Sequence, residues 1–332
     1  MKWIGLLALL SMASMCKSPQ SGSSSGPSTS AFDKARAMKD LQMFAAEPHE
    51  LGSARNALLA NYIDQEMKSI GLTIERIKFD VEVPDPELLN QDASMMRKAT
   101  LTKSLENVTA TYKSSSAKAC VYLLGSHYDS KRLSGVESVG ANDSGSSSAA
   151  LMEIMRSLKT QSPSFRCHVK AIWFDGEEAY LPNWRDGESR HPANQIDNTY
   201  GSRFYTSSLK ACDSAWCTAE GDKVEGLILL DMVGEANLTL SDDINSTQAL
   251  RDLAKVVDQS LFKGELFRGV SPKGIEDDHI PFLRKNIPAI DLIGFENTSH
   301  WHQPTDTFDK IDADSLLKVG QLTDEMLKRL LL

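Results

Sequence analysis

Two adjacent carboxylates, Glu177 and Glu178, directly follow the apolar run of residues 169–174. A run of this kind is typical of a strand buried on both faces, so the pair is expected at a strand end. On a sharp turn, adjacent side chains point in different directions, so one glutamate can bind a metal ion while its neighbour faces a substrate as a base. The pair therefore predicts metal-assisted acid–base chemistry.

Four other residues with metal-binding side chains occupy similar places. His127 and Asp231 each follow an apolar run. Asp143 lies in a loop of small residues before a predicted helix, and His302 lies in the loop after the last apolar run. In open α/β sheets ligands bind at the carboxyl ends of strands, so these side chains are expected to meet. Their nitrogen and oxygen atoms are ligands that suit zinc.

Each of these residues, taken alone, has a simpler explanation. Asp143 could cap the following helix, and Asp231 could be a turn residue at a strand end. His127 and His302 could be hydrogen-bonded loop histidines. The prediction of a metal site therefore depends on the whole set together with the glutamate pair.

The elements that position these residues alternate along the chain. Hydrophobic periodicity predicts helices over residues 31–46, 53–71, 146–158, 200–210 and 312–332. Alternating or continuous apolar runs predict strands over residues 73–83, 106–113, 118–126, 168–175, 225–233 and 288–294. This order predicts an α/β fold, a three-layer sandwich in which helices flank a mixed, mostly parallel central sheet.

Composition limits the partners of the chain. Of its 332 residues, 41% are hydrophobic, which is enough for one large core. The net charge of -9 and the absence of a basic stripe interleaved with aromatic residues argue against nucleic acid as a partner.

The N-terminal residues predict export. One lysine precedes a short apolar stretch over residues 3–10 and then small residues, which is a secretory signal pattern. We predict a signal peptide over residues 1–16, a Ser/Gly/Pro-rich linker over 17–30 and a single zinc-dependent catalytic domain over 31–332. Cys16 could carry the lipid of a bacterial lipoprotein and anchor the protein to a membrane; otherwise the protein is secreted or periplasmic.

The remaining cysteines are even in number, which makes disulfides plausible in an exported chain. Cys212 and Cys217 flank a predicted loop and are the better pair. Cys120 and Cys167 each open a predicted strand, so they could either pair across neighbouring strands or serve as small buried residues.

From residue 31 to the C-terminus, the ordered set of His, Asp, Glu-Glu, Asp and His resembles the zinc-dependent peptidases of the M28 superfamily. Within it the stretches "SHYDSK", "GANDS", "FDGEEAYLPNW", "NTYGSRF", "EDDHIPFLRKNIP" and "SHWH" are most similar to glutaminyl-peptide cyclotransferases. These enzymes convert N-terminal glutamine of peptides to pyroglutamate with loss of ammonia. Asp277 and Trp301 favour this family, since M28 aminopeptidases usually have Ser at the first position and often Tyr at the second.

The resemblance implies that one Zn²⁺ per chain is bound by Asp143, Glu178 and His302. It also implies that Glu177 is the general acid/base, that Asp231 and Asp277 form a carboxylate network beside it, and that Trp301 and Trp184 line the pocket for the glutamine. Glu177 would take the proton of the attacking amine and return it to the leaving nitrogen, with a pKa raised by burial and neighbouring acids. Asp231 and Asp277 would share a proton.

Two other functions fit the same fold. In a two-zinc aminopeptidase, His127 and Asp231 would bind a second zinc, Asp143 would bridge both ions and Glu177 would activate water. A catalytically inactive binding module is the other alternative, against which the presence of Glu177 argues. The chain also departs from animal cyclotransferases, which have Gln at Glu276, His at Asp291 and cysteines near the metal site where this chain has Ser126, Ser147 and Ser148.

Overall fold

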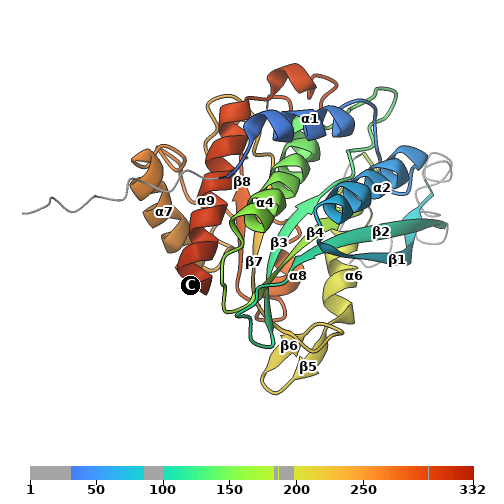
Figure 1. Ribbon diagram of the computed structural model, residues 1–332. Helices are drawn as coiled ribbons and strands as arrows, with labels where there is room; N and C mark the ends of the chain where they lie inside the picture. Colours follow the sequence, from blue (N-terminus) through green and yellow to red (C-terminus); the bar gives the residue numbers. More distant parts are fainter. Residues whose placement is uncertain (1–30, 86–99, 183–185, 187–197, 298) are drawn as a thin grey trace, which may run out of the picture.

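The computed structural model describes residues 31–85, 100–182, 186, 198–297 and 299–332 (Figure 1). The predicted signal peptide with Cys16, the linker and Trp184 lie outside the described residues. Within these ranges, no helix combines the length and apolar character that crossing a membrane requires.

A mixed sheet of eight described strands forms the middle layer (Figure 1). The strands are β1 (Thr73–Pro84), β2 (Thr100–Tyr112), β3 (Cys120–His127), β4 (His168–Phe174), β5 (Lys210–Cys212), β6 (Ala215–Cys217), β7 (Lys223–Asp231) and β8 (Ala289–Ile293). The central strands β4, β3, β7 and β8 are parallel neighbours in that order, whereas β1, β2, β5 and β6 join by antiparallel pairing. The predicted sheet is confirmed.

Helices cover both faces of this sheet. They are α1 (Lys34–Phe44), α2 (Ala54–Ser69), α4 (Ser147–Gln161), α6 (Tyr200–Ser208), α7 (Gln248–Phe262), α8 (Ile280–Leu283) and α9 (Ala313–Leu331). In Figure 1, α1, α2, α4 and α9 lie over one face, and their apolar residues form one core with that face of the sheet. Residues of α6 and α8 join a second core on the other face. The three-layer α/β sandwich is therefore confirmed.

The side chains of β3 show why the central strands read as continuous apolar runs. Tyr122 and Leu124 belong to the core beneath α4, while Val121 and Leu123 belong to the core on the opposite face. Because successive side chains of a strand point to opposite faces, a strand covered on both sides has no polar positions in its middle. The strand ends are then the first places where polar side chains can gather.

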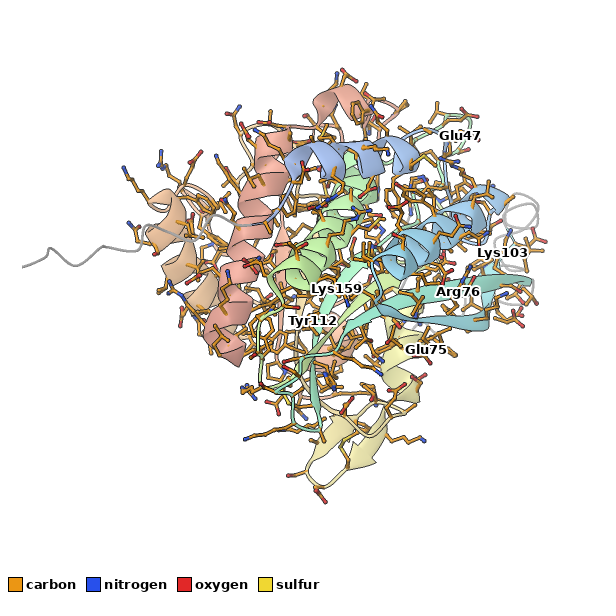
Figure 2. The ribbon with its side chains drawn as sticks, viewed as in Figure 1. Glu47, Glu75, Arg76, Lys103, Tyr112 and Lys159 are labelled. Atoms are coloured by element: carbon orange, nitrogen blue, oxygen red, sulfur yellow. A yellow bond between two sulfur atoms is a disulfide. The ribbon has the colours of Figure 1, made fainter. Side chains whose placement is uncertain are left out.

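Besides the short elements β5, β6 and α8, which were not predicted, α7 and β2 differ from the sequence prediction. α7 was not predicted, although Leu250, Ala254 and Val257 have helical spacing and form its buried face. β2 begins at Thr100 instead of residue 106, because it pairs with β1 along its whole length. Its early part has apolar side chains only at Leu101 and Leu105, which are too few for alternation to reveal a strand. In Figure 2, Arg76 and Lys103 are labelled on this two-stranded extension.

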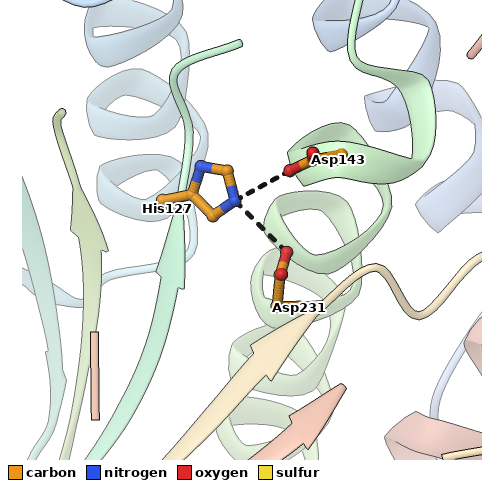
Figure 3. A group of neighbouring side chains, drawn as sticks. All are labelled: His127, Asp143 and Asp231. Carbon is orange, nitrogen blue, oxygen red and sulfur yellow. Dashed lines mark hydrogen bonds and ion pairs between the residues drawn. The ribbon is translucent and has the colours of Figure 1, made fainter. Parts of the chain in front are cut away.

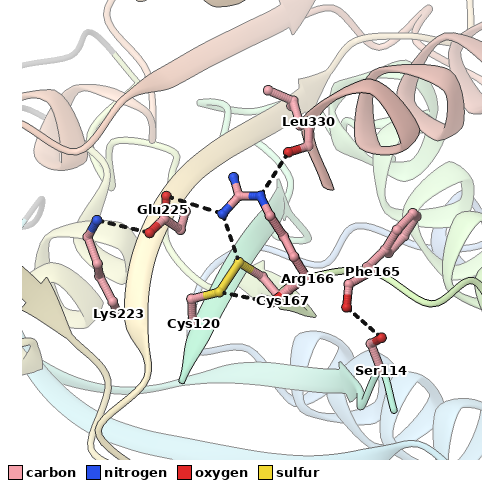
Figure 4. The surroundings of a disulfide bond; sticks show 8 residues. All are labelled: Ser114, Cys120, Phe165, Arg166, Cys167, Lys223, Glu225 and Leu330. Carbon is pink, nitrogen blue, oxygen red and sulfur yellow. Dashed lines mark hydrogen bonds and ion pairs between the residues drawn. A yellow bond between two sulfur atoms is a disulfide. The ribbon is translucent and has the colours of Figure 1, made fainter. Parts of the chain in front are cut away.

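Both cysteine pairs considered from the sequence form disulfides, including Cys120–Cys167, which the sequence had left open. Cys120 and Cys167 join the starts of the neighbouring strands β3 and β4, and Figure 4 shows the bond beside Arg166. Arg166 Nε donates to the Leu330 carbonyl oxygen at 3.2 Å, which ties this corner of the sheet to the end of α9. Cys212 and Cys217 also pair. Their connection is not the predicted loop but the β5–β6 hairpin.

Candidate metal and acid–base site

Three parallel strands bring the predicted residues together at the carboxyl end of the sheet. β3 ends at His127, β7 ends at Asp231, and the glutamate pair follows β4. Asp143 enters from the π-helical turn η2 (Ala141–Ser146) that precedes α4. Figure 3 shows His127 Nε2 between two carboxylates, 3.2 Å from Asp143 Oδ1 and 3.2 Å from Asp231 Oδ1.

A second group shares Asp143 and lies on its other side. His302 Nε2 is 3.1 Å from Glu178 Oε1 and 3.4 Å from Asp143 Oδ2. One ligand atom from each of these three residues lies within 4.8 Å of the others, and the same holds for His127, Asp143 and Asp231. One imidazole and two carboxylates converging in this way fit a zinc ion in either group. This second group, Asp143, Glu178 and His302, is the zinc site predicted from the sequence.

The glutamate pair is held by the carboxylate of Asp129. Asp129 Oδ1 accepts from the backbone N–H groups of Gly176 at 2.9 Å and Glu177 at 3.0 Å, and Oδ2 accepts from Glu178 N at 3.2 Å. Gly176 has φ +76°, a left-handed conformation that other residues adopt only with strain. This turn directs the two adjacent glutamates differently, so that Glu178 faces His302.

Asp306 positions the turn that carries Asp143. Its carboxylate accepts from Asn142 N at 2.7 Å and from Asp143 N at 3.1 Å. Gly140 has φ +55°, and a Cβ there would lie 2.2 Å from the backbone oxygen of Asp143, so only glycine fits. The peptide bond between Asp143 and Ser144 is cis. These contacts fix the backbone of the residue that both groups share.

Glu177 has the environment of a general base. Its side chain is buried, and Asn198 Nδ2 donates to Glu177 Oε1 at 2.6 Å. Burial, followed by the nearby carboxylate of Asp277, raises the pKa of Glu177 well above its usual range. A carboxyl group in this setting can hold a proton near neutral pH and release it to a neighbour.

Further buried acids surround Glu177. Burial raises the pKa of Asp231 to about 7. Burial also raises the pKa of Asp277, and together with the negative charge of Asp277 it raises the pKa of both Asp278 and Asp291. So many carboxyl groups cannot all be ionised at once, so the cluster holds shared protons. The charge of Asp277 therefore acts on Asp231, Asp278 and Asp291 as well as on Glu177.

The negative charge of neighbouring carboxylates raises the pKa values of the two histidines of the site. Burial alone would lower the pKa of His302, but the carboxylates of Glu178 and Asp143 outweigh it and raise this pKa to about 9. Burial likewise opposes protonation of His127, yet its contacts with Asp129, Asp143 and Asp231 raise its pKa well above 6.5. The carboxylates therefore favour a positive charge beside both histidines. A bound metal cation would supply this positive charge in place of the proton.

A cavity of about 350 Å³ opens beside these groups. Its lining residues are Asp143, Glu177, Glu178, Asp231, Met232, Lys273, Gly274, Ile275, Glu276, Asp277, Ile293, Phe295, Trp301 and His302. The Trp301 ring stacks on that of His302 with centroids 4.1 Å apart and meets Phe295 edge-on at 5.0 Å. The cavity thus combines an aromatic wall with acidic groups.

Sequence reasoning missed several residues of the site. Lys131 is buried, donates to the Ala179 carbonyl oxygen at 2.7 Å and places its Nζ 3.5 Å from Glu178 Oε2. Lys131 and Asn198 lie within the family-like stretches "SHYDSK" and "NTYGSRF", but neither they nor Asp306 have a spacing that predicts a role. Ser126, noted as a departure from animal enzymes, has its Oγ 3.0 Å from Ser147 Oγ inside the same region.

The family model described as Peptidase family M28 matches residues 107–327. The chain belongs to this family. The matched residues include every proposed metal ligand and the glutamate pair, so the family extends over the whole site. The resemblance to the M28 superfamily that the sequence predicted is confirmed.

Individual relatives point to one branch of the family. The glutaminyl-peptide cyclotransferase of Drosophila melanogaster is 27% identical over 289 residues, covering 80% of this chain and 72% of the fly protein. The crystal structure of a glutaminyl cyclase from an Acidobacteriales bacterium superposes with a TM-score of 0.71 at 25% identity, covering 94% of this chain and 98% of that one. The resemblance to glutaminyl-peptide cyclotransferases is therefore confirmed.

The fold itself is shared more widely. The structure of a leucine aminopeptidase precursor from Bacteroides thetaiotaomicron has a TM-score of 0.72 at 20% identity, covering 89% of this chain and 97% of that chain. At this identity the likeness concerns the fold alone. The choice between activities depends on the site.

Proposed function

We propose that this protein is a zinc-dependent glutaminyl-peptide cyclotransferase that converts N-terminal glutamine of peptides or proteins to pyroglutamate and releases ammonia. The observation that carries the proposal is the position of Asp277, whose buried carboxyl lines the cavity together with Glu177 and Asp231, beside the metal-ligand group. An amine substrate must lose a proton before it attacks, and a cluster of protonatable acids suits that task.

The proposed zinc ligands are Asp143, Glu178 and His302. Zinc held there would supply a Lewis acid for the oxygen of the substrate's side-chain amide. Two features of the chain support this assignment: the three ligand atoms converge, and Lys131 lies near Glu178 Oε2 while Glu178 Oε1 faces His302.

In the proposed reaction the substrate supplies its own nucleophile. The α-nitrogen of the glutamine forms a bond to the amide carbon, and the bond from that carbon to the amide nitrogen breaks, so ammonia leaves. Glu177 takes the proton from the α-amine and delivers it to the departing nitrogen. Asp231 and Asp277, sharing protons with their neighbours, can bind the amine and keep Glu177 ready to accept a proton.

The aromatic wall supplies the geometry for ring closure. Trp301 and Phe295 pack against each other beside His302 and can hold the glutamine side chain in a curled conformation, which reduces the entropic cost of ring closure. We also assign Trp184 to this pocket on the basis of the family resemblance.

The proposal includes the organisation of the chain. Residues 1–16 would direct export, residues 17–30 would be a linker and residues 31–332 would form the catalytic domain. The enzyme would then be secreted or periplasmic, or anchored to a membrane through a lipid on Cys16, and would act on exported peptides with N-terminal glutamine.

A two-zinc aminopeptidase is the second candidate. The observation in its favour is the complete group of His127, Asp143 and Asp231, which shares Asp143 with the proposed zinc ligands Glu178 and His302. In this alternative Glu177 would activate water to cleave the first peptide bond.

One experiment separates these functions. The protein lacking residues 1–30 is incubated with a Gln-initiated dipeptide amide and, separately, a Leu-initiated one, and both ammonia and free amino acid are measured. Ammonia from the first and no free leucine from the second support the cyclotransferase. Free leucine supports the aminopeptidase. No turnover of either peptide by zinc-loaded protein contradicts both and favours a binding module. The Glu177→Gln variant controls for contaminating activity.

A further inference from the structure

The cavity wall that carries Asp277 has no regular secondary structure. Residues 273–277 line the cavity, yet they belong to no helix and to no strand of the sheet. At its start, Lys273 pairs with the neighbouring loop: its N–H donates to the Asp242 carbonyl oxygen at 3.1 Å, and its carbonyl oxygen accepts from Ile244 N at 2.9 Å. The geometry of the segment must therefore come from contacts with neighbouring loops and side chains.

The carboxylate of Asp243 lies directly behind this wall. The Asp243 side chain is buried, and its Oδ1 accepts from Ile275 N at 2.9 Å and from Asn245 N at 3.0 Å. Its Oδ2 lies 3.1 Å from Nε2 of His279. Ile275 and His279 precede and follow Asp277 by two residues each, so one carboxylate contacts the chain on both sides of the acid in the cavity.

A second branch leads from Asp243 to β8. Ser246 donates to Asp243 Oδ2 through both its backbone N–H at 2.8 Å and its Oγ at 2.6 Å. The same Oγ accepts from Asp291 N at 2.9 Å. Asp291 is the buried acid whose pKa the charge of Asp277 helps to raise. Asp243 is thus connected, directly or through one hydroxyl, to the backbone around both acids.

The adjacent residue differs in its contacts. The Asp242 carboxylate points away from the cavity toward α7, where Oδ1 accepts from Arg251 Nη2 at 2.6 Å and Oδ2 lies 2.8 Å from Lys255 Nζ. Asp242 and Asp243 lie on the same loop, and both are buried and charged. Only Asp243 has side-chain contacts with the cavity wall.

We propose that Asp243 is a positioning residue for the proposed cyclisation: its carboxylate holds the segment from Ile275 to His279 so that Asp277 faces Glu177 across the cavity. This inference rests on the proposed function for its kinetic consequence, but not for its structural one. Asp243 does not line the cavity, so it acts through Asp277 and does not itself touch the substrate.

The Asp243→Asn variant tests this role, with Asp242→Asn as the matched control. Asparagine keeps the size of the side chain but offers an NH₂ group where Oδ2 accepts two hydrogen bonds. In Asp243→Asn we expect kcat/KM for a Gln-initiated peptide to fall at least tenfold, with zinc affinity within twofold of the unchanged protein. In Asp242→Asn we expect kcat/KM to stay within twofold of that of the unchanged protein. This should hold even if its melting temperature falls as much as that of Asp243→Asn.

Hydrogen exchange of the wall gives a readout that does not need turnover. In Asp243→Asn, amides of residues 273–279 are expected to exchange at least tenfold faster, while Asp242→Asn leaves them unchanged. If Asp243→Asn folds poorly, Ser246→Ala is used in its place. It should also make the amides of residues 273–279 exchange faster, by a smaller factor. Unchanged exchange of the wall in Asp243→Asn, or equal changes in both aspartate variants, overturns the proposal. If the wall exchanges faster in Asp243→Asn but the unchanged protein itself releases no ammonia, the positioning role stands and only the proposed function is overturned.

Discussion

Replacing Asp129 with asparagine should weaken zinc binding, although Asp129 is not itself one of the proposed zinc ligands. The Asp129 carboxylate accepts three backbone N–H groups, from Gly176, Glu177 and Glu178. An asparagine oxygen can keep the two bonds that Oδ1 now accepts. Its NH₂ group would then face the N–H of Glu178, two donors in contact, so that bond is lost and a buried N–H has no acceptor.

The size of this effect follows from the bonds involved. A buried donor without its acceptor costs about 1–3 kcal/mol, and the remaining two bonds lose the strengthening that a full negative charge gives. Because the affected N–H belongs to the proposed ligand Glu178, part of this loss of free energy should appear as weaker zinc binding. Loss of a group that orients a metal ligand typically lowers metal affinity by about 10–100-fold, and we expect a change in that range.

Chelator competition measures the zinc affinity of the variant, and thermal unfolding of the metal-free protein measures its stability. The matched control is Asp258→Asn, because Asp258 is also buried and accepts backbone N–H groups from Leu266 at 3.1 Å and Phe267 at 3.2 Å, and it lies on α7 and does not line the cavity. Both variants should lose similar stability. Zinc affinity of Asp129→Asn within twofold of the unchanged protein, or an equal loss in Asp258→Asn, would refute the reasoning.

Three further outcomes are expected. Glu177→Gln should lower kcat for ammonia release by about 10²–10⁴-fold with unchanged zinc content, and a variant that keeps a tenth of the activity argues against its role as the base. Glu178 and Asp143 outweigh the effect of burial and raise the pKa of His302 to about 9, so below that pH zinc must displace a proton from His302. Zinc affinity should therefore rise about tenfold per pH unit from pH 7 to 9 and then level off. A zinc affinity that does not change with pH contradicts this expectation. Replacing Cys120 and Cys167 by alanine should cost about 4 kcal/mol of unfolding free energy, against about 2 kcal/mol for the other disulfide, because they close loops with separations of 47 and 5 residues; equal losses in chemical denaturation would contradict the loop argument.

The fold could be predicted because its central strands are covered on both sides. β3, β4, β7 and β8 are mostly apolar between their ends, with Lys170 and Asp291 as buried exceptions, so the polar residues at the ends of β3, β4 and β7 are visible in the sequence. That is how His127, Asp231 and the glutamate pair were found. The helices over the sheet were visible from their periodicity, and even α7 carries that signal in Leu250, Ala254 and Val257.

The supporting contacts could not be predicted because they join polar residues far apart in sequence. Asn198 follows Glu177 by 21 residues, and Asp306 follows Asp143 by 163. Neither lies in a periodic stretch, and a polar loop residue that accepts or donates one hydrogen bond resembles any other. Likewise, the polar half of β2 owes its strand conformation to its partner β1, not to its own pattern.

The central claim is that one zinc ion, held by Asp143, Glu178 and His302, supports cyclisation. Its most direct test is to remove all metal from the protein and add zinc back in steps while ammonia release from a Gln-initiated peptide is followed. Activity should rise linearly and reach its maximum at one zinc per chain, and His127→Ala should leave this stoichiometry unchanged. Activity that appears only as a second zinc binds, and that is lost with His127, would contradict it.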